Sequence, residues 1–416
     1  MKYLISIYLF LLIFRPYEYW PELGQFNIQR MFMIFLLIAV FFYQNKKIII
    51  NSIQVWLFSF ILVLLVSSIF ALDTSRAMTA TTKFLDIVVF FYVLVLCIHD
   101  QESLKFVFFS FVVIMFLYVG KSMWEYFIHG RYMYRMGVAR LTGIDKTYSD
   151  PNSFAATVCY SLPIVWVYLS REQLQKFWQR LIVLVYLFLC PFAIFFTGSR
   201  SGLVVGLFFF LLIFFRIKKK YLVVLFGCAL LIISWQVLPE AHRMRFMSLI
   251  DPSLAPAAKS AEESAQGRVR GLKHGIYLIK KYPLFGVGPD NARLSWSDGT
   301  QIHNLYGQVM GETGFLGVLT FFGFVGSVMM VFYRNIHQLE EMKKADCACC
   351  YKESDFKFLL HLNQAALMTI LLLLFNGLFG HNMFRYTWLL ISFIAISSQT
   401  IIEKMGCQSI PIEGSI

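Results

Sequence analysis

Apolar runs, each about 15–20 residues long and able to cross a bilayer as a helix, recur from one end of this chain to the other. Helices are expected because a helix satisfies its own backbone hydrogen bonds in lipid, and the runs are too uniformly apolar for barrel strands. Hydrophobic residues make up 58% of the 416 residues and charged residues 15%, which is more apolar surface than a soluble domain could bury. The sequence therefore predicts an all-α integral membrane protein.

We expect about twelve transmembrane helices, forming a single polytopic membrane domain over residues 1–416. The first run lacks a small-residue cleavage pattern at its end, so it is interpreted as a helix rather than a removed signal peptide. Short basic segments between runs fall on the same side as the N-terminus, which the positive-inside rule makes cytoplasmic. The expected spans are 3–14, 30–43, 53–71, 84–98, 105–120, 153–169, 182–197, 201–215, 221–237, 304–332, 358–375 and 386–402.

Two segments on the opposite, external side are longer than connectors, namely 121–152 and 238–302. The second is predicted to be a large loop between the ninth and tenth transmembrane helices, and it contains short helix patterns. Long ordered loops are usually functional. The chain carries a net charge of +13, and many of its basic residues fall on this external side. That charge favours an anionic substrate, with attraction to anionic lipid headgroups as the alternative.

The external turn TGSRSGLVVG, residues 197–206, places Arg200 at the membrane boundary. Its guanidinium can bind two phosphate oxygens at once, although an arginine that only anchors a helix end would look the same. Gly198, Gly202 and Gly206 recur at a spacing of four residues, which predicts a helix face that another backbone can approach closely.

A second pattern is the loop helix around 267–282. At about 100° per residue Arg268 lies at the edge of its apolar face, whereas Arg270 points the opposite way. Arg268 is therefore the basic residue expected to point at the protein or at a ligand, unless it pairs with Glu262 or Glu263. The apolar face is predicted to consist of Val269, Leu272, Ile276 and Ile279.

The segment IHNLYGQVMGETGFLGVL begins a helix at the external surface with His303, a candidate general base near neutral pH. An interfacial histidine that anchors a helix end is the alternative, and His381 between the last two helices is the rival base. Asn304 and the buried Glu312 are predicted to be supporting residues. The glycines of this segment are predicted to form another close-packing face: Gly307, Gly311, Gly314 and Gly317.

The segment ARLTGIDKTYSDPNSFA supplies further candidates. Asp150 before Pro151 is typical of a helix N-cap followed by proline at the first position. Arg140 is a weaker candidate for contact with an anion, and Asn152 is a candidate for a hydrogen bond between helices.

The external carboxylates do not cluster in a way that suits a metal, since only Glu262 and Glu263 are adjacent. Walker, Rossmann and HExxH patterns are absent from the sequence. We therefore expect no metal, no cofactor and no nucleic-acid partner.

Together these four segments resemble the O-antigen ligase family of bacterial envelope enzymes, which includes O-antigen polymerases and protein O-oligosaccharyltransferases. TGSRSG resembles the family's arginine turn, and GRVRGLKHGIYLIKKYPLFGVGPDN resembles its large periplasmic loop. HNLYGQVMGETGFLGVL resembles the family's histidine helix, and RLTGIDKTYSDPNSFA its earlier arginine segment. The resemblance covers roughly residues 135–320.

The resemblance implies a bacterial inner-membrane glycosyltransferase with its active site facing the periplasm. It would transfer a glycan from undecaprenyl pyrophosphate to an acceptor hydroxyl. Ligation to lipid A-core is favoured, with O-antigen or exopolysaccharide polymerisation and protein O-glycosylation as alternatives. His303 would be the catalytic base, and Arg200, Arg268 and Arg140 would bind the pyrophosphate. A transporter of lipid-linked glycans is the more distant alternative, but such proteins place charges near the bilayer midplane.

Overall fold

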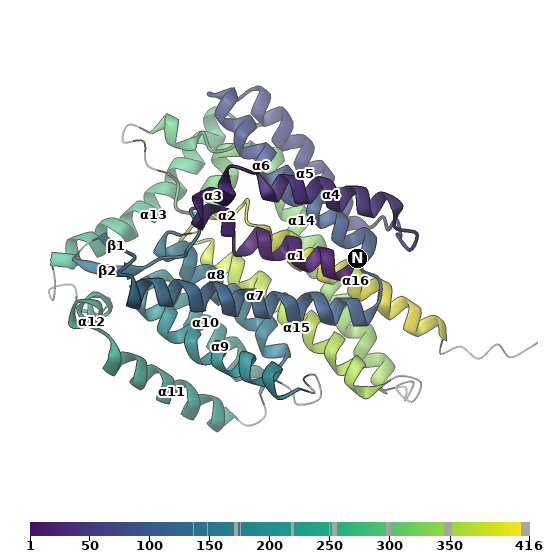
Figure 1. Cartoon of the computed structure of the whole chain (residues 1–416). Coiled ribbons are helices and arrows are strands. Elements are labelled where there is room, and N and C mark those ends of the chain that lie inside the picture. Colours follow the sequence, from purple (N-terminus) through teal and green to yellow (C-terminus); the bar gives the residue numbers. More distant parts are fainter. Residues whose placement is uncertain are drawn as a thin grey trace, which may run out of the picture.

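The computed structural model of the chain describes all residues except 136, 148, 170–173, 175, 218–219, 249, 252–255, 297–298, 300, 345–351 and 409–416. The side chains of 21, 222–223, 226, 256–265 and 406–408 also lie outside the described part. Most helices run side by side in a bundle (Figure 1). The N-terminus and the end of α16 lie at one end of the bundle, and β1, β2, α12 and α13 lie at the other.

Each predicted span overlaps one helix, although several helices extend beyond the span. These helices are α1 (Lys2–Ile13), α4 (Ile28–Phe42), α5 (Ser52–Ile69), α6 (Thr74–Cys97), α7 (Gln101–Ile128), α8 (Pro151–Val167), α9 (Phe177–Phe196), α10 (Arg200–Arg216), α11 (Lys220–Val237), α14 (Leu305–Lys344), α15 (Glu353–Asn376) and α16 (Tyr386–Gln408). Shorter elements connect them: α2 (Pro16–Tyr19), α3 (Pro21–Gly24), β1 (Tyr132–Arg135), β2 (Val138–Leu141), α12 (Glu240–Met247), α13 (Pro256–Lys281) and the 3₁₀ turn η2 (Ala292–Ser295).

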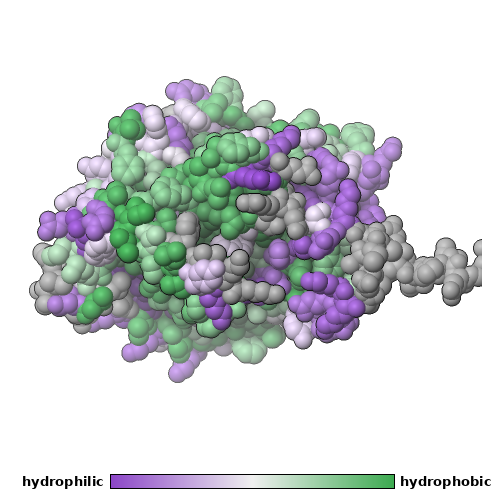
Figure 2. All heavy atoms as spheres, turned by 90° about the horizontal axis from the view of Figure 1, so that it is seen from below, coloured by the Kyte–Doolittle hydropathy of each residue, from purple (hydrophilic) through white to green (hydrophobic). Residues whose placement is uncertain are grey.

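Within the described residues, seven helices are long and apolar enough to cross a membrane: α5, α6, α7, α9, α14, α15 and α16. The predicted all-α membrane fold is confirmed by these helices, whereas the predicted number of about twelve spans stays a prediction. Figure 2 shows hydrophobic residues across the middle of one face, with hydrophilic residues gathered mostly toward its edges.

The segment 121–152, which the sequence predicts to be external, differs from the prediction in its structure. Helix α7 continues to Ile128, and residues 132–141 form an antiparallel hairpin in which Met133 pairs with Arg140. The sequence did not indicate the hairpin because its strands are only four residues long. Gly137, at a φ of 75°, lies between the two strands.

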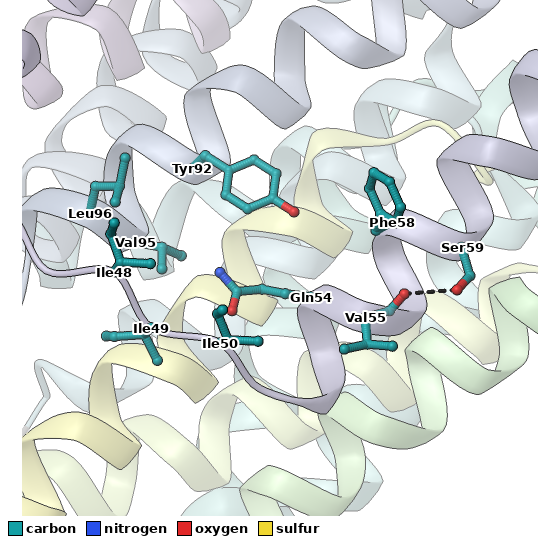
Figure 3. Close-up of a pocket in the computed structure, with 10 residues that line it drawn as sticks. All are labelled: Ile48, Ile49, Ile50, Gln54, Val55, Phe58, Ser59, Tyr92, Val95 and Leu96. Carbon is teal, nitrogen blue, oxygen red and sulfur yellow. Dashed lines mark hydrogen bonds between the residues drawn. The ribbon is translucent and has the colours of Figure 1, made fainter.

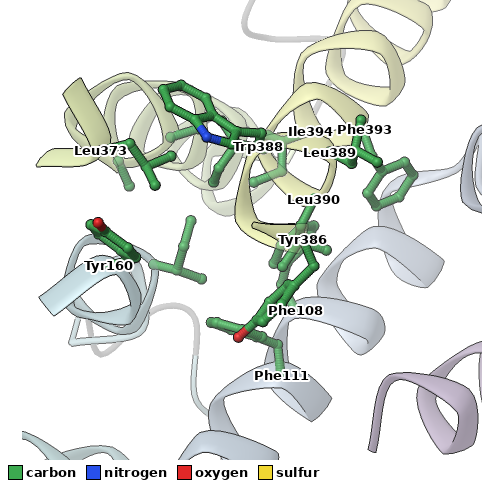
Figure 4. Packing of buried hydrophobic residues seen from close by; sticks show 14 of the residues in the cluster. Phe108, Phe111, Tyr160, Leu373, Tyr386, Trp388, Leu389, Leu390, Phe393 and Ile394 are labelled. Carbon is green, nitrogen blue, oxygen red and sulfur yellow. The ribbon is translucent and has the colours of Figure 1, made fainter. Parts of the chain in front are cut away.

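The core of the bundle lies where α15 and α16 pack against α7 and α8. Phe108, Tyr160, Leu373, Trp388 and Phe393 are all almost completely buried there, as Figure 4 shows. Helix α14 adds a second large contact surface, because it packs against both α5 and α13. This core carries the N-terminus of α14 and the loop 377–385 at the end of the bundle that holds the candidate site.

Helix α14 is interrupted at Gly314, whose φ of 65° and ψ of −163° are not helical. The prediction of one continuous helix was therefore wrong at this residue. The segment 283–288 fills the break: two of its amides donate to the carbonyls of Gly311 and Glu312, each at 3.0 Å. Two of its carbonyls accept from amides just after the break, at 2.7 and 3.3 Å. Broken backbone is tolerated in a membrane protein when other groups satisfy it in this way.

Helix α13 packs against α14 through glycines. A Cβ on Gly275 would lie 2.3 Å from the Gly307 carbonyl oxygen, and a Cβ on Gly271 would lie 3.5 Å from the backbone nitrogen of His303. The predicted close-packing face of α14 is confirmed at Gly307 and Gly311. The predicted apolar contact face of α13 was wrong, however, because Val269 and Ile276, two of its members, are 55% and 39% exposed. The helix buries Gly271, Gly275 and Leu278 instead.

Candidate functional site

The turn between α9 and α10 is fixed by side chains from three other segments. Arg140 donates from Nε to the Thr197 carbonyl at 2.7 Å, and Arg245 donates from Nε to the Gly198 carbonyl at 2.7 Å. Cationic donors suit these carbonyls because the C-terminus of a helix carries partial negative charge. Gly198 itself has a φ of 58° and lies in the turn, so it does not belong to the predicted glycine face of α10. Gly202 does belong to it, facing the Ala155 side chain.

Arg200 is the first residue of α10, which Ser199 caps by accepting from the Gly202 amide. Its Nε donates to the Arg245 carbonyl at 3.2 Å. Asn152 braces the same turn, because its Oδ1 accepts from Arg140 at 2.9 Å and from Ser199 at 2.8 Å. Arg200 is thus held at the end of the bundle by a rigid turn rather than by a flexible loop.

Asp150 has the predicted geometry of an N-cap. Its carboxylate accepts from the amides of Asn152 and Ser153 at 2.8 and 3.2 Å, and Pro151 is the first residue of α8. The predicted cap is confirmed. Burial lowers the pKa of Arg140 and the pKa of His303. The negative charge of Asp150 opposes part of this lowering in both residues, so its charge reaches the site.

Arg268 lies on the flank of α13 that faces the protein, and Arg270 is exposed, as the helix periodicity predicted. The Arg268 guanidinium lies over the ring of Phe379, with 5.4 Å from Cζ to the ring centroid. Burial, followed by the charge of Arg200, lowers the pKa of Arg268. The alternative pairing of Arg268 with Glu262 or Glu263 falls on side chains outside the described part.

His303 immediately precedes the residue that caps α14. Asn304 accepts from the Gly307 amide at 3.0 Å and donates to the Leu378 carbonyl at 3.3 Å, so it links the start of α14 to the loop 377–385. The side chain of His303 is exposed. The surrounding protein nevertheless displaces enough water from the imidazole to lower the pKa of His303. The negative charge of Asp150 opposes this lowering, and the positive charge of Arg268 adds to it. A neutral imidazole that solvent can reach is suited to accept a proton.

His381, the rival base, faces His303, with 5.2 Å between the two ring centroids. Its Nδ1 is buried and has no hydrogen-bond partner among the described residues. Burial, followed by the charges of His303 and Arg385, lowers the pKa of His381 to about 3. His381 is therefore a neutral group behind His303, less open to a substrate.

Two arginines of this region were not singled out from the sequence. Arg245, on α12, is 7% exposed. Arg385 is 6% exposed, and it donates to the Thr157 hydroxyl at 2.7 Å. Both are basic residues at the ends of apolar runs, and this position was the signal by which the sequence could have identified them. Their burial depends on contacts with α8 and the α9–α10 turn that no sequence spacing encodes.

We use the name cationic cluster for Arg140, Arg200, Arg245, Arg268 and Arg385. The four segments selected from the sequence converge here. Arg140 contacts the turn that carries Arg200, and Gly271 of the helix that carries Arg268 lies against the His303 backbone. Burial, followed by the charge of Arg200, lowers the pKa of Arg268, so the positive charges of these segments act on one another. Guanidinium groups keep their charge at neutral pH. The arrangement therefore combines a proton acceptor with several fixed positive charges, which suits a reaction in which an anion leaves.

Glu312 lies apart from His303, in accordance with the prediction that it ties elements together. Its carboxylate accepts from Gln308 at 3.2 Å, and its backbone carbonyl accepts from Ser67 at 3.0 Å. The described residues contain no group of three or more His, Cys, Asp or Glu side chains arranged to hold a metal ion.

Two cavities lie elsewhere in the bundle. One of about 360 Å³ is lined by Ile48–Ile50 and by side chains of α5 and α6, among them Val55 and Tyr92 (Figure 3). Another of about 550 Å³ lies along α1 and α7, near Trp20 and Trp124. Both are lined mainly by apolar residues, and neither includes a member of the cationic cluster.

Comparison with known proteins identifies one family. The sequence pattern of the O-antigen ligase family matches residues 184–322, a stretch that contains Arg200, Arg268, His303 and Glu312. The resemblance predicted from the sequence is thereby confirmed. A comparison with curated proteins found no match.

Proposed function

We propose that this O-antigen ligase family protein, a membrane glycosyltransferase, takes its glycan from a polyprenyl-pyrophosphate donor and transfers it to an acceptor hydroxyl, with His303 as the catalytic base. The observation that supports this most strongly is the convergence of the cationic cluster with an exposed neutral imidazole at one end of the bundle. Undecaprenyl pyrophosphate is the donor that we propose.

In the proposed reaction His303 takes the proton of the acceptor hydroxyl as its oxygen attacks the anomeric carbon of the glycan. The bond between that carbon and the pyrophosphate oxygen breaks, and the lipid pyrophosphate leaves with the electron pair. Arg200 and Arg268 stabilise the negative charge that grows on the leaving group. Arg140 holds the turn that carries Arg200 and adds its own positive charge from behind it.

Asn304, Asp150, Asn152 and Glu312 act as supporting residues. Asn304 fixes the start of α14 beside His303, and Asn152 braces the turn beside Arg200. Asp150 caps α8, and Glu312 helps to hold the segment that fills the break in α14. No metal ion has a role in this mechanism, since the arginines carry fixed charge.

We propose the bacterial inner membrane as the location, with the cationic cluster on the periplasmic side. A lipid A-core sugar is the favoured acceptor. A growing glycan or a protein Ser or Thr hydroxyl would make the same enzyme a polymerase or a protein transferase. A transporter of lipid-linked glycans is a weaker alternative, because Arg140, Arg245 and Arg268 belong to β2, α12 and α13, which Figure 1 shows at one end of the bundle rather than at its middle.

The test uses purified protein in detergent, with a lipid-linked glycan donor and each of the three acceptor classes in turn. Transfer in detergent distinguishes an enzyme from a transporter, since no compartments are present. We expect His303→Ala to abolish transfer without reducing the amount of folded protein. If His303→Ala retained transfer and His381→Ala lost it, the assignment of the base would be wrong.

A further inference from the structure

The support beneath Arg268 is an aromatic ring. Its guanidinium makes no hydrogen bond or ion pair with any other group in the described part of the chain, and it lies over Phe379 with 5.4 Å from Cζ to the ring centroid. Cation–π contacts of this kind hold a guanidinium in place through the electrostatic field of the ring.

An aromatic ring and a carboxylate support an arginine in different ways. A carboxylate occupies the N–H donors and cancels the positive charge, so a phosphate would have to compete with it. A ring has no net charge, and it contacts the flat face of the guanidinium while leaving the N–H edge available. The contact with Phe379 therefore fixes the orientation of Arg268 without reducing its attraction for an anion.

Phe379 is itself held firmly. Its amide donates to the Asn376 carbonyl at 2.8 Å, and its ring packs edge-on against Phe375 at 5.5 Å between centroids. Phe375 in turn packs against Phe208 of α10 at 4.4 Å. The ring is thus the end of an aromatic chain that begins on the helix carrying Arg200.

The loop around Phe379 also contacts the start of α14. Leu378, directly before it, accepts from Asn304, and His381, two residues after it, faces His303. Gly377 accepts from the Leu305 amide at 2.7 Å. One short loop therefore contacts both the proposed base and the proposed pyrophosphate-binding arginine.

We propose that Phe379 is a positioning residue of the transfer reaction, whose ring directs the Arg268 guanidinium at the diphosphate of the donor without itself cancelling the charge. This inference rests on the proposed function. The ring touches no reacting atom, and it acts only through Arg268.

The test compares Phe379→Leu, Phe379→Tyr and Phe379→Glu in the purified, full-length protein with a lipid-linked donor. We expect Phe379→Leu to lower kcat by about tenfold, the size of a cation–π contact, with a smaller change in KM because leaving-group charge develops in the transition state. Phe379→Tyr keeps a ring and should restore most of the rate. Phe379→Glu should be slower than Phe379→Leu, because the carboxylate would hold Arg268 but cancel its charge.

Leu378→Ala is the matched control. It shortens the neighbouring side chain of the same loop and keeps the Leu378 carbonyl that accepts from Asn304, and Leu378 has no contact with Arg268 among those the structure describes. Equal losses in Leu378→Ala and Phe379→Leu would show that Phe379 contributes packing alone and would overturn the inference. Wild-type kcat in Phe379→Glu would overturn it as well, and this variant remains informative if Phe379→Leu does not fold.

Arg268→Ala separates this inference from the function on which it rests. Full transfer by Arg268→Ala would contradict the proposed role of Arg268, and the inference about Phe379 would fail with it. An inactive Arg268→Ala together with a fully active Phe379→Leu would contradict only the role of Phe379.

Discussion

Replacing Gly275 by alanine tests whether the glycine contact between α13 and α14 sets the geometry of the site. The added Cβ would lie 2.3 Å from the Gly307 carbonyl oxygen and 2.5 Å from its Cα. These neighbours are backbone atoms, which cannot rotate away as a flexible side chain could. Ordinary contact begins near 3.4 Å, so the two helices must separate by about 1 Å.

That separation moves Arg268 relative to His303, because the two residues lie on opposite sides of the contact. A misplacement of about 1 Å can cost a reaction about 10²-fold in rate, and overpacking costs about 1–3 kcal/mol of stability. Alanine also favours a helix over glycine by about 1 kcal/mol, which offsets part of the loss of stability but none of the misplacement. We therefore expect Gly275→Ala to fold and to lose most of its transfer activity.

Gly267→Ala is the matched control, since nothing lies within 4 Å of a Cβ at that position on the same helix. It gains the same helix propensity without the clash, and it lies next to Arg268 in the sequence. The assay is kcat/KM for glycan transfer by both purified variants, with thermal unfolding measured in parallel. Activity of Gly275→Ala within about threefold of Gly267→Ala would refute the view that this contact positions the arginine.

Four further predictions concern the chemistry. Arg268→Ala should cost far more activity than Arg270→Ala in the same assay, because only Arg268 faces the protein; equal losses would contradict the helix geometry. Arg200→Lys should be impaired nearly as strongly as Arg200→Ala, because lysine cannot form two parallel bonds to a phosphate; full activity of the lysine variant would mean that charge alone suffices. Because the pKa of His303 is lowered, the acidic limb of the kcat/KM profile should lie below pH 6.5, the ordinary value for histidine, and a midpoint above it would contradict His303 as the base. Transfer in excess EDTA should proceed at nearly the untreated rate, and inhibition that magnesium or manganese reverses would show that the arginines are not sufficient.

The positions of the helices were predictable because lipid imposes one simple requirement, a long apolar run. The extensions of helices beyond these apolar runs were not predictable. Helix α6 begins at Thr74 and not near residue 84, and α7 ends at Ile128 and not near residue 120. The added turns contain polar residues, which hydrophobicity assigns to loops although their backbones remain helical.

The candidate site shows a similar division. The direction of Arg268 followed from helix periodicity, and the N-cap role of Asp150 followed from its position before proline. The contact face of α13 did not follow, because glycines decide it and aliphatic residues do not. Hydrophobic periodicity assumes that burial follows side-chain apolarity, and glycine has no side chain to be detected.

The loop 377–385 illustrates a limit of a different kind. The sequence identified His381 as a rival base, and the structure places it behind His303 together with the aromatic support of Arg268. These contacts join residues 268 and 379, which lie more than a hundred positions apart, through the packing of α13, α14 and α15. Such a juxtaposition depends on how helices cross, and single-sequence patterns describe only one helix at a time.

Close packing and charge act together in this site. Several guanidinium groups held near one another repel, so a flexible loop would let them separate. Here each is anchored by a rigid neighbour: a helix-end carbonyl for Arg140 and Arg245, a capped helix start for Arg200, the Thr157 hydroxyl for Arg385, and a glycine contact with an aromatic support for Arg268. The contacts of the fold therefore offset the repulsion between these charges before any substrate binds. A diphosphate would bind to arginines that are already in position. Electrostatic stabilisation accelerates a reaction most under this condition.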